Sequence, residues 1–170
     1  IKPESFFILD LQIHNNNDIF TDIYECLNDY VKPDELIGDN AWFNEKTNKL
    51  EDVHKQIRFW SFPKIVIITL NRFTPDGSSK INNNIKFPID NLDLSKYVTG
   101  YNATSYKYEL YGICNHIGNV RGGHYTAFVR NTANTWLHYN DRDVEKVDNP
   151  EAIISSAAYC LFYRKKNNNV

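Results

Sequence analysis

The stretch RGGHYTAF (residues 121–128), followed by WLHYND (residues 136–141), decides the fold of this chain because it predicts a β-hairpin with polar side chains at one end. It places His124 behind two glycines at the start of one strand, and Asn140 and Asp141 at the end of the next. A histidine beside a hydrogen-bonding partner is the base and the orienting group of many nucleophilic hydrolases. No nucleophile for such a site is evident in these residues.

The geometry of this hairpin predicts that the histidine and the amide meet. If the polar turn at residues 131–134 is centred near Thr132, the register pairs residues whose numbers sum to about 264. His124 then lies opposite Asn140, with Cβ atoms roughly 4.5–5.5 Å apart. The amide oxygen can accept a hydrogen bond from the imidazole and fix its tautomer. A slip of one residue would bring Asp141 closer instead.

Gly122 and Gly123 predict open space beside the histidine. Because neither residue has a Cβ atom, a substrate backbone can pass close to the imidazole. The two glycines also allow the preceding loop, residues 115–121, to move.

Outside the hairpin, apolar periodicity predicts further strands. The sequence KIVIITLNRF (residues 64–73) gives the strongest signal, and its near-continuous β-branched run predicts burial on both faces. In residues 5–13, alternating apolar side chains from Phe7 to Ile13 share one face. Further strands are expected at residues 85–87, 107–114, 124–130, 135–140 and 158–164.

Two short helices complete the prediction. Asp18 is the expected N-cap of the first, whose apolar residues recur at helical spacing from Phe20 to Val31 before Pro33 ends it. The second runs from Asn149 to about Ser156, and residues 38–53 are polar and irregular. The predicted fold class is α+β, a mainly antiparallel sheet with a few short helices.

Composition limits the possible functions. With 170 residues, 42% hydrophobic and 14% aromatic, the chain is long enough for one domain with a core. The formal net charge of −2 gives no basis for nucleic-acid binding, and no apolar run approaches the ~20 residues of a membrane span. Cys26, Cys114 and Cys160 form neither a close pair nor a metal-type spacing, which indicates a reducing compartment, the cytoplasm or the nucleus. The absence of methionine indicates a fragment or a processed chain.

Three motifs carry a family resemblance: GGHYTAF at residues 122–128, W-x-x-Y-N-D-x-x-V from residue 136, and AYCLFYR at residues 158–164. Together they resemble the ubiquitin-specific proteases, which are papain-like cysteine deubiquitinases. The resemblance covers residues 1–170 as the C-terminal part of such a catalytic domain, with fingers over roughly 1–63 and palm over roughly 64–166. It implies that the N-terminal lobe carrying the catalytic cysteine is absent from this chain.

The resemblance also implies roles for individual residues. His124 would be the general base for the catalytic thiol, Asn140 would orient it, and the adjacent Asp141 would support the site. Residues 115–123 would form a blocking loop over the channel for the C-terminal tail of ubiquitin. The residues expected to line that channel are Gly122, Gly123 and Tyr125.

The family's nucleophile and zinc ligands have no counterpart in this sequence. No Asn-Thr-Cys-type box is present, and Cys26 and Cys160 fall in apolar patterns typical of a core. Cys114, ten residues before the histidine, is the one local substitute, and a core role is favoured for it too. No Cys-x-x-Cys pair occurs, so no metal and no cofactor are expected. Trp42 and Phe43 either contact ubiquitin or, as favoured here, pack in place of the zinc.

These observations predict a thiol-dependent deubiquitinase that cleaves the bond after ubiquitin's C-terminal glycine. Its nucleophile lies outside this chain, which alone is expected to be inactive. The expected partners are ubiquitin, ubiquitinated proteins and the N-terminal lobe, without nucleic acid or membrane. The alternatives are a non-catalytic ubiquitin-binding module or pseudoprotease, and an enzyme that uses Cys114. Without the lobe, an exposed apolar face is expected to make the chain poorly soluble.

Overall fold

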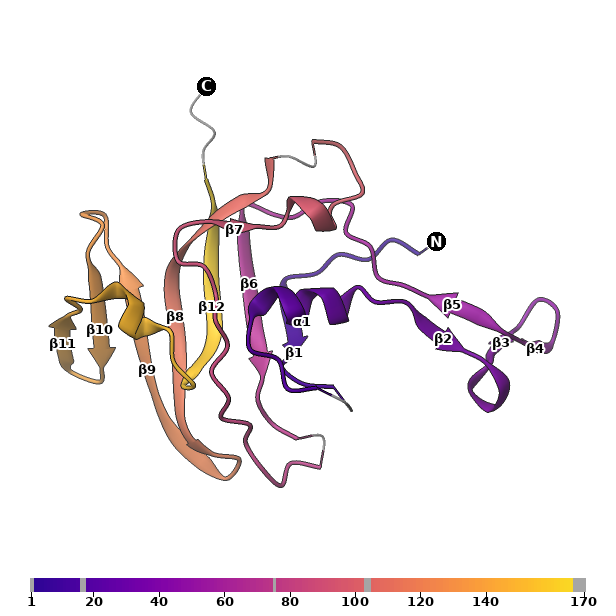
Figure 1. Ribbon diagram of the computed structural model, residues 1–170, viewed down its shortest axis with the longest axis horizontal. Coiled ribbons are helices and arrows are strands. Elements are labelled where there is room, and N and C mark those ends of the chain that lie inside the picture. The colour runs from indigo at the N-terminus through magenta and orange to yellow at the C-terminus, as the bar shows by residue number, and fades with distance from the viewer. Residues whose placement is uncertain (1, 16–17, 75, 103–104, 167–170) are drawn as a thin grey trace.

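The computed structural model describes residues 2–15, 18–74, 76–102 and 105–166. Within these residues one eight-stranded sheet has the order β1-β6-β12-β8-β9-β10-β11, with β7 paired to β8 outside this path (Figure 1). Its strands are β1 (Ile8–Gln12), β6 (Ile65–Asn71), β7 (Leu92–Asp93), β8 (Lys107–Asn119), β9 (Gly122–Arg130), β10 (Trp136–Asn140), β11 (Asp143–Lys146) and β12 (Ala158–Lys165). The β1–β6 pair is parallel and the other pairs are antiparallel. The predicted α+β class is confirmed.

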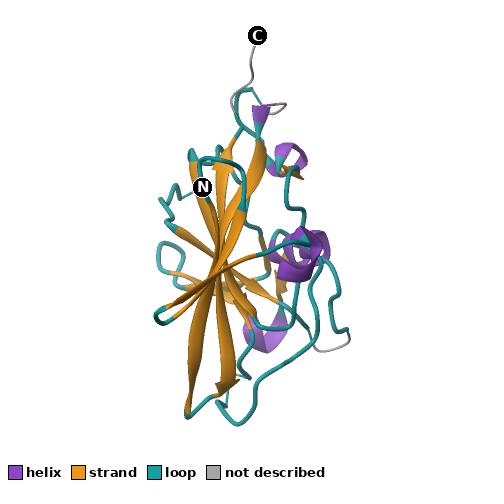
Figure 2. Cartoon of the chain, turned by 90° about the vertical axis from the view of Figure 1, so that its left-hand side faces the viewer, coloured by secondary structure: helices purple, strands orange, loops and turns teal. Residues whose placement is uncertain are grey.

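The core lies against one face of this sheet. Val66, Ile68 and Leu70 of β6 are buried on that face, and burial of each such side chain contributes about 1.5–3 kcal/mol. On the other face Ile65 is exposed and Ile67 is half-buried. The prediction that this strand is buried on both faces is therefore wrong, because the helices cover only one side of the sheet (Figure 2).

Helix α1 (Ile23–Tyr30) packs on the covered face through Ile23, Cys26 and Leu27. Its N-cap is Asp22 and not the predicted Asp18. The Asp22 carboxylate accepts a hydrogen bond from the Tyr24 amide at 2.7 Å, and the Glu25 carboxylate accepts one from the Asp22 amide at 3.2 Å. This reciprocal pair satisfies amides that the first helical turn leaves without partners, so it outcompetes the earlier aspartate.

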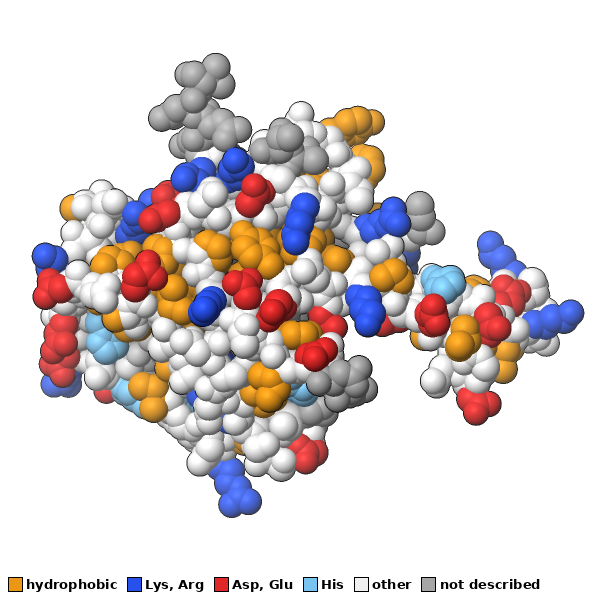
Figure 3. Space-filling model, in the orientation of Figure 1, with side chains coloured by type: hydrophobic (Ala, Val, Ile, Leu, Met, Phe, Trp, Pro, Cys, Tyr) orange, Lys and Arg blue, Asp and Glu red, His pale blue; other side chains and the backbone are white. Residues whose placement is uncertain are grey.

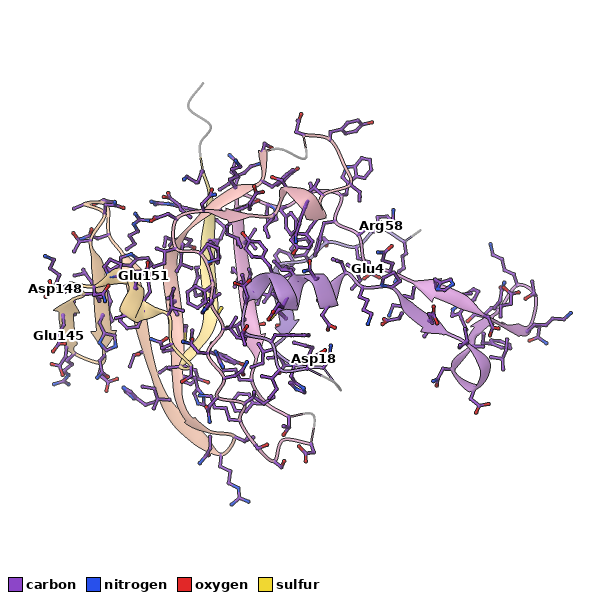
Figure 4. The ribbon with its side chains drawn as sticks, viewed as in Figure 1. Glu4, Asp18, Arg58, Glu145, Asp148 and Glu151 are labelled. Atoms are coloured by element: carbon purple, nitrogen blue, oxygen red, sulfur yellow. The ribbon has the colours of Figure 1, made fainter. Side chains whose placement is uncertain are left out.

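Two small sheets form an arm that projects from the main body (Figure 1). They pair β2 (Asp34–Leu36) with β5 (Val53–Lys55), and β3 (Trp42–Asn44) with β4 (Lys49–Glu51). The prediction that residues 38–53 are irregular is wrong, because they form the 3₁₀ turn η1 (Gly38–Asn40) and the β3–β4 hairpin. Figure 4 labels Glu4 and Arg58 at the base of the arm, where the Phe6 and Phe59 rings meet at 5.6 Å.

The remaining differences from the sequence prediction are local. Phe7 is 85% exposed and does not share the buried face of Leu9 and Leu11. Residues 85–87 contribute a single bridge and not a strand. The helix expected after Asn149 is the shorter 3₁₀ helix η4 (Pro150–Ile153), and a further 3₁₀ turn, η2, spans Ser95–Tyr97.

Candidate active site

The predicted contact between His124 and Asn140 is present, although the predicted register is not. The His124 Nε2 atom lies 2.5 Å from the Asn140 Oδ1 atom. Trp136 pairs with Arg130, so the β9–β10 ladder is shifted by two residues from the register predicted for a turn at Thr132. Because side chains alternate with a period of two, a two-residue shift keeps both groups on the same face as diagonal neighbours.

This hydrogen bond determines which imidazole nitrogen can act as a base. The amide oxygen of Asn140 only accepts hydrogen bonds, so the His124 Nε2 atom carries the proton. The Nδ1 atom keeps a free lone pair. The side chain of His124 is about half exposed, at 47%, so the imidazole can be reached from outside the chain. A fixed tautomer with an accessible basic nitrogen is what proton abstraction from a thiol requires.

Asp141 is a more distant neighbour of the histidine. Its Oδ2 atom lies 4.0 Å from the His124 Nε2 atom, beyond hydrogen-bonding distance, and its side chain is 80% exposed. Its backbone has a positive φ of 52°, which turns the chain from β10 into β11. Asp141 can therefore support a charged imidazole electrostatically, but Asn140 is the residue that orients it.

The two glycines before His124 have different surroundings. A Cβ atom added to Gly122 would meet no atom within 4 Å, so the space predicted from the sequence is present there. A Cβ atom on Gly123 would lie 2.4 Å from the His116 Nε2 atom and 2.5 Å from the Ile117 carbonyl oxygen. Gly123 therefore accommodates the chain's own β8 strand. His116 is not among the site residues predicted from the sequence, although an extended β8–β9 register places it opposite Tyr125.

The segment expected to be a mobile loop is regular. Residues 115–123 form the end of a long β8–β9 ribbon, in which Asn119 pairs with Gly122 around a turn at Val120 and Arg121. Tyr125 follows on the ribbon and is more than half exposed. The ribbon extends below the body of the molecule (Figure 1).

The three thiols are poorly placed to react with the His124 base. Cys114 pairs with Ala127, three residues from the histidine, so its side chain projects from the opposite face of the sheet. Burial raises the pKa of all three thiols, to about 12 for Cys26 and about 11 for Cys160. A protonated thiol is a weak nucleophile. The local alternative in which Cys114 attacks is therefore unfavourable in both geometry and ionisation.

The tip of the arm is held by a carboxylate. The Asn44 amide and the Thr47 hydroxyl donate to Glu51 at 3.0 and 2.6 Å, and these bonds lower the pKa of the Glu51 carboxyl. Trp42 and Phe43 are about half exposed, at 48% and 49%, which contradicts the expectation that they pack in place of zinc. In the described part of the chain, no group of three or more His, Cys, Asp or Glu side chains could hold a metal ion.

Charged side chains of both signs are interspersed on the helix-covered face of the molecule (Figure 3). Glu145, Asp148 and Glu151 lie around β11 and η4, at the end of the sheet away from the arm (Figure 4). Glu145 is paired with His138 of β10, the strand that ends at Asn140. Acidic side chains thus lie beside β10, the strand that carries the orienting amide of Asn140. No helix among the described residues is long and apolar enough to cross a membrane.

Sequence comparisons identify what this chain is similar to. Residues 12–163 match the family model for ubiquitin carboxyl-terminal hydrolase. Ubiquitin carboxyl-terminal hydrolase 10 of Arabidopsis thaliana is 39% identical over 146 residues, which cover 84% of this chain and 16% of that protein. Ubiquitin carboxyl-terminal hydrolase 19 of Homo sapiens is 34% identical over 158 residues, which cover 86% of this chain and 12% of that protein.

Solved structures agree with the sequence comparisons. A chain of a SAGA DUB module containing Ubp8, Sgf11, Sus1 and Sgf73 matches with a TM-score of 0.77 and 30% identity, covering 95% of this chain and 36% of that chain. A SAGA DUB module bound to monoubiquitin matches with a TM-score of 0.75 and 30% identity, covering 94% and 35%. The chain thus spans about a third of these solved chains and less than a fifth of the two curated relatives.

Proposed function

Because this chain belongs to the ubiquitin-specific protease family of ubiquitin carboxyl-terminal hydrolases, we propose that it supplies the base half of a thiol-dependent deubiquitinase. The observation that carries this proposal is the 2.5 Å hydrogen bond between His124 Nε2 and Asn140 Oδ1. A non-catalytic scaffold has no use for an oriented, half-exposed base. The nucleophilic cysteine then lies on a segment outside residues 1–170.

The proposed reaction uses His124 twice. Its Nδ1 atom takes the proton of the cysteine thiol, and the thiolate attacks the carbonyl carbon of ubiquitin's C-terminal glycine. The imidazolium then gives its proton to the leaving amine, and a thioester remains. Water activated by the same imidazole hydrolyses the thioester. Asn140 keeps the ring in position throughout, and the Asp141 carboxylate stabilises the imidazolium across 4.0 Å.

The channel for the ubiquitin tail is proposed to run over Gly122 and Tyr125. The open space at Gly122 supports this path, and the exposed Tyr125 ring would border it from the other side of the ribbon. That a structural neighbour was solved bound to monoubiquitin supports ubiquitin as the partner. Residues 115–123 would border the channel as a paired ribbon, so its opening would require movement of two strands together.

The missing lobe is proposed to cover the uncovered face of the sheet. A row of residues crosses that face through the pairs Ile8–Ile67, Ile67–Phe162, Phe162–Gly112 and Gly112–Val129. Ile8 is 47% exposed and Val129 is 37% exposed. An exposed apolar row of this length marks a surface that a partner covers. This supports a second lobe that packs against the palm.

A ubiquitin propargylamide probe tests the proposal, because it bonds covalently to a catalytic thiolate. The full-length protein is expected to be labelled, with the modified cysteine mapped by peptide mass spectrometry outside residues 1–170. The His124→Ala variant is expected to label at least tenfold more slowly. Labelling at Cys114 would support the local nucleophile instead. Ubiquitin binding without any labelling would support a pseudoprotease and would refute the proposed reaction.

A further inference from the structure

Behind the strand that carries His124 lies a second, buried histidine. His116 of β8 is 4% exposed and lies opposite Tyr125 in the β8–β9 ladder. Because neighbouring strand positions face opposite sides, His116 lies on the side of the ribbon away from the His124 imidazole. It does not contact the hydrogen bond to Asn140 that the proposed reaction uses.

We infer that His116 is a positioning residue for His124, acting through Gly123 and Tyr125, an assignment that rests on the proposed function. The edge of its imidazole occupies the space where Gly123 would carry a Cβ atom, 2.4 Å from the His116 Nε2 atom. Its ring is tilted by 43° relative to the Tyr125 ring, with centroids 4.8 Å apart. The two residues that flank His124 in the chain therefore both rest on His116.

His116 is itself fixed on every side. Its amide donates to the Ala157 carbonyl at 2.9 Å, and its own carbonyl accepts from the Lys80 ammonium at 2.5 Å. The rings of Phe73 and Tyr159 lie 5.7 and 6.1 Å from its ring. These contacts connect the ribbon to the end of β6, to the segment after it and to β12. A rigid support of this kind is what a base needs for a fixed position.

The chemistry of His116 suits a support and not a second base. Its Nδ1 atom is buried without a hydrogen-bond partner among the described residues. Burial and the nearby Lys80 ammonium lower the pKa of its imidazole, which favours the neutral ring. A longer side chain at this position would collide with Gly123. The ring therefore acts as a planar spacer.

Loss of the His116 ring is expected to displace the His124 base. A displacement of about 1 Å in a reacting group can cost about 100-fold in rate. The His116→Ala change removes the surface on which Gly123 and Tyr125 rest, while Asn140 and the open space at Gly122 remain. The His116→Ala variant is therefore expected to have a lower kcat and to lose the uniform Nε2–H tautomer of His124, while KM changes less than about threefold.

The test uses the full-length protein with ubiquitin-aminomethylcoumarin as substrate and ¹⁵N-histidine labelling for NMR. For His116→Ala, kcat is expected to fall at least tenfold, and the His124 signals are expected to change from one Nε2–H tautomer to a mixture. Cys26→Ala is the matched control, since it removes a buried side chain from α1, on another element, and should lower the melting temperature alone.

Lys80→Ala provides a second variant if His116→Ala does not fold. It leaves the imidazole in place and removes only its carbonyl anchor, so a smaller loss of kcat, about threefold, is expected with the same NMR change. A fall in melting temperature with kcat and tautomer unchanged, as in the control, would overturn the inference. A wild-type protein that does not hydrolyse the substrate would refute the proposed function, and the NMR comparison would still decide the role of His116.

Discussion

The two neighbouring glycines before His124 allow one substitution to be compared with its own control. Alanine at position 123 places a Cβ atom 2.4 Å from a side-chain nitrogen of His116 and 2.5 Å from the Ile117 carbonyl oxygen. Alanine at position 122 meets nothing within 4 Å. Neither glycine has a positive φ, so backbone strain does not distinguish the two sites.

The expected destabilisation follows from these distances. Ordinary van der Waals contact begins near 3.4 Å, so Gly123→Ala must separate two paired strands by about 1 Å. The Ile117 carbonyl cannot move aside, because Ile117 is paired with His124 in the β8–β9 ladder. Overpacking of this kind costs up to about 3 kcal/mol, which corresponds to a fall of roughly 6–12 °C in melting temperature for a chain of this size. Gly122→Ala should stay within about 0.5 kcal/mol, or 2 °C.

Differential scanning fluorimetry and ubiquitin-aminomethylcoumarin hydrolysis on the full-length variants check this reasoning. Gly123→Ala is expected to lose both stability and kcat. Gly122→Ala is expected to keep its stability but to raise KM at least about tenfold, because its methyl group would occupy space proposed for the ubiquitin tail. Equal melting temperatures for the two variants would refute the argument that His116 fills the space at Gly123.

Three further predictions concern single side chains. Asn140→Ala should lower kcat about 10- to 100-fold because the base loses its hydrogen-bonded partner, whereas Asp141→Ala should cost at most about fivefold, as expected for an exposed pair at 4.0 Å. Steady-state kinetics with the reverse order would contradict this prediction. Arg72→Leu should destabilise the protein by about 2–4 kcal/mol in urea titrations, because the buried guanidinium donates to the carbonyls of Ala158, Ile81 and Asn83. A change below about 1 kcal/mol would show that water satisfies these carbonyls when the guanidinium is absent. The folded-state pKa of His116 lies below its ordinary value of 6.5, so its contribution to stability is fully present above that value and should fall as the pH drops from about 7 to 5. His116→Gln should flatten this part of the pH profile of the melting temperature. Parallel profiles for the variant and the wild type would contradict the assignment.

The contact between His124 and Asn140 could be predicted from the sequence because it needs only two adjacent strands. Alternation fixes which residues share a face, and this survives an error of two residues in register. The register itself could not be predicted, because the turn is centred on Ala133, where Asn134 adopts a φ of 63° and tolerates the left-handed conformation better than most residues. An error of one residue would have placed the amide on the opposite face.

Other features depend on partners distant in sequence. Asp22 is the N-cap of α1 because it exchanges reciprocal hydrogen bonds with the first turn and Glu25. This capping-box pattern can be recognised in the sequence. The role of Gly123 could not be predicted from the sequence, because it depends on His116 in another strand and on the Lys80 side chain that anchors His116. A glycine pair in a sequence indicates missing Cβ atoms but not which of the two spaces remains empty.

The origin of the base in a single hairpin has a consequence for the order of assembly. His124 and Asn140 are separated by 16 positions, and their hydrogen bond forms within the β9–β10 pair. The support from His116 comes from β8, which is directly adjacent in both sequence and sheet. The hydrogen bond between His124 and Asn140 lies on the face away from the row proposed to receive the second lobe, whereas His116 shares the face of Gly112 and Val129. The base is therefore oriented before the nucleophile arrives, so the NMR signature of the Nε2–H tautomer should be the same with or without covalent modification of the catalytic cysteine.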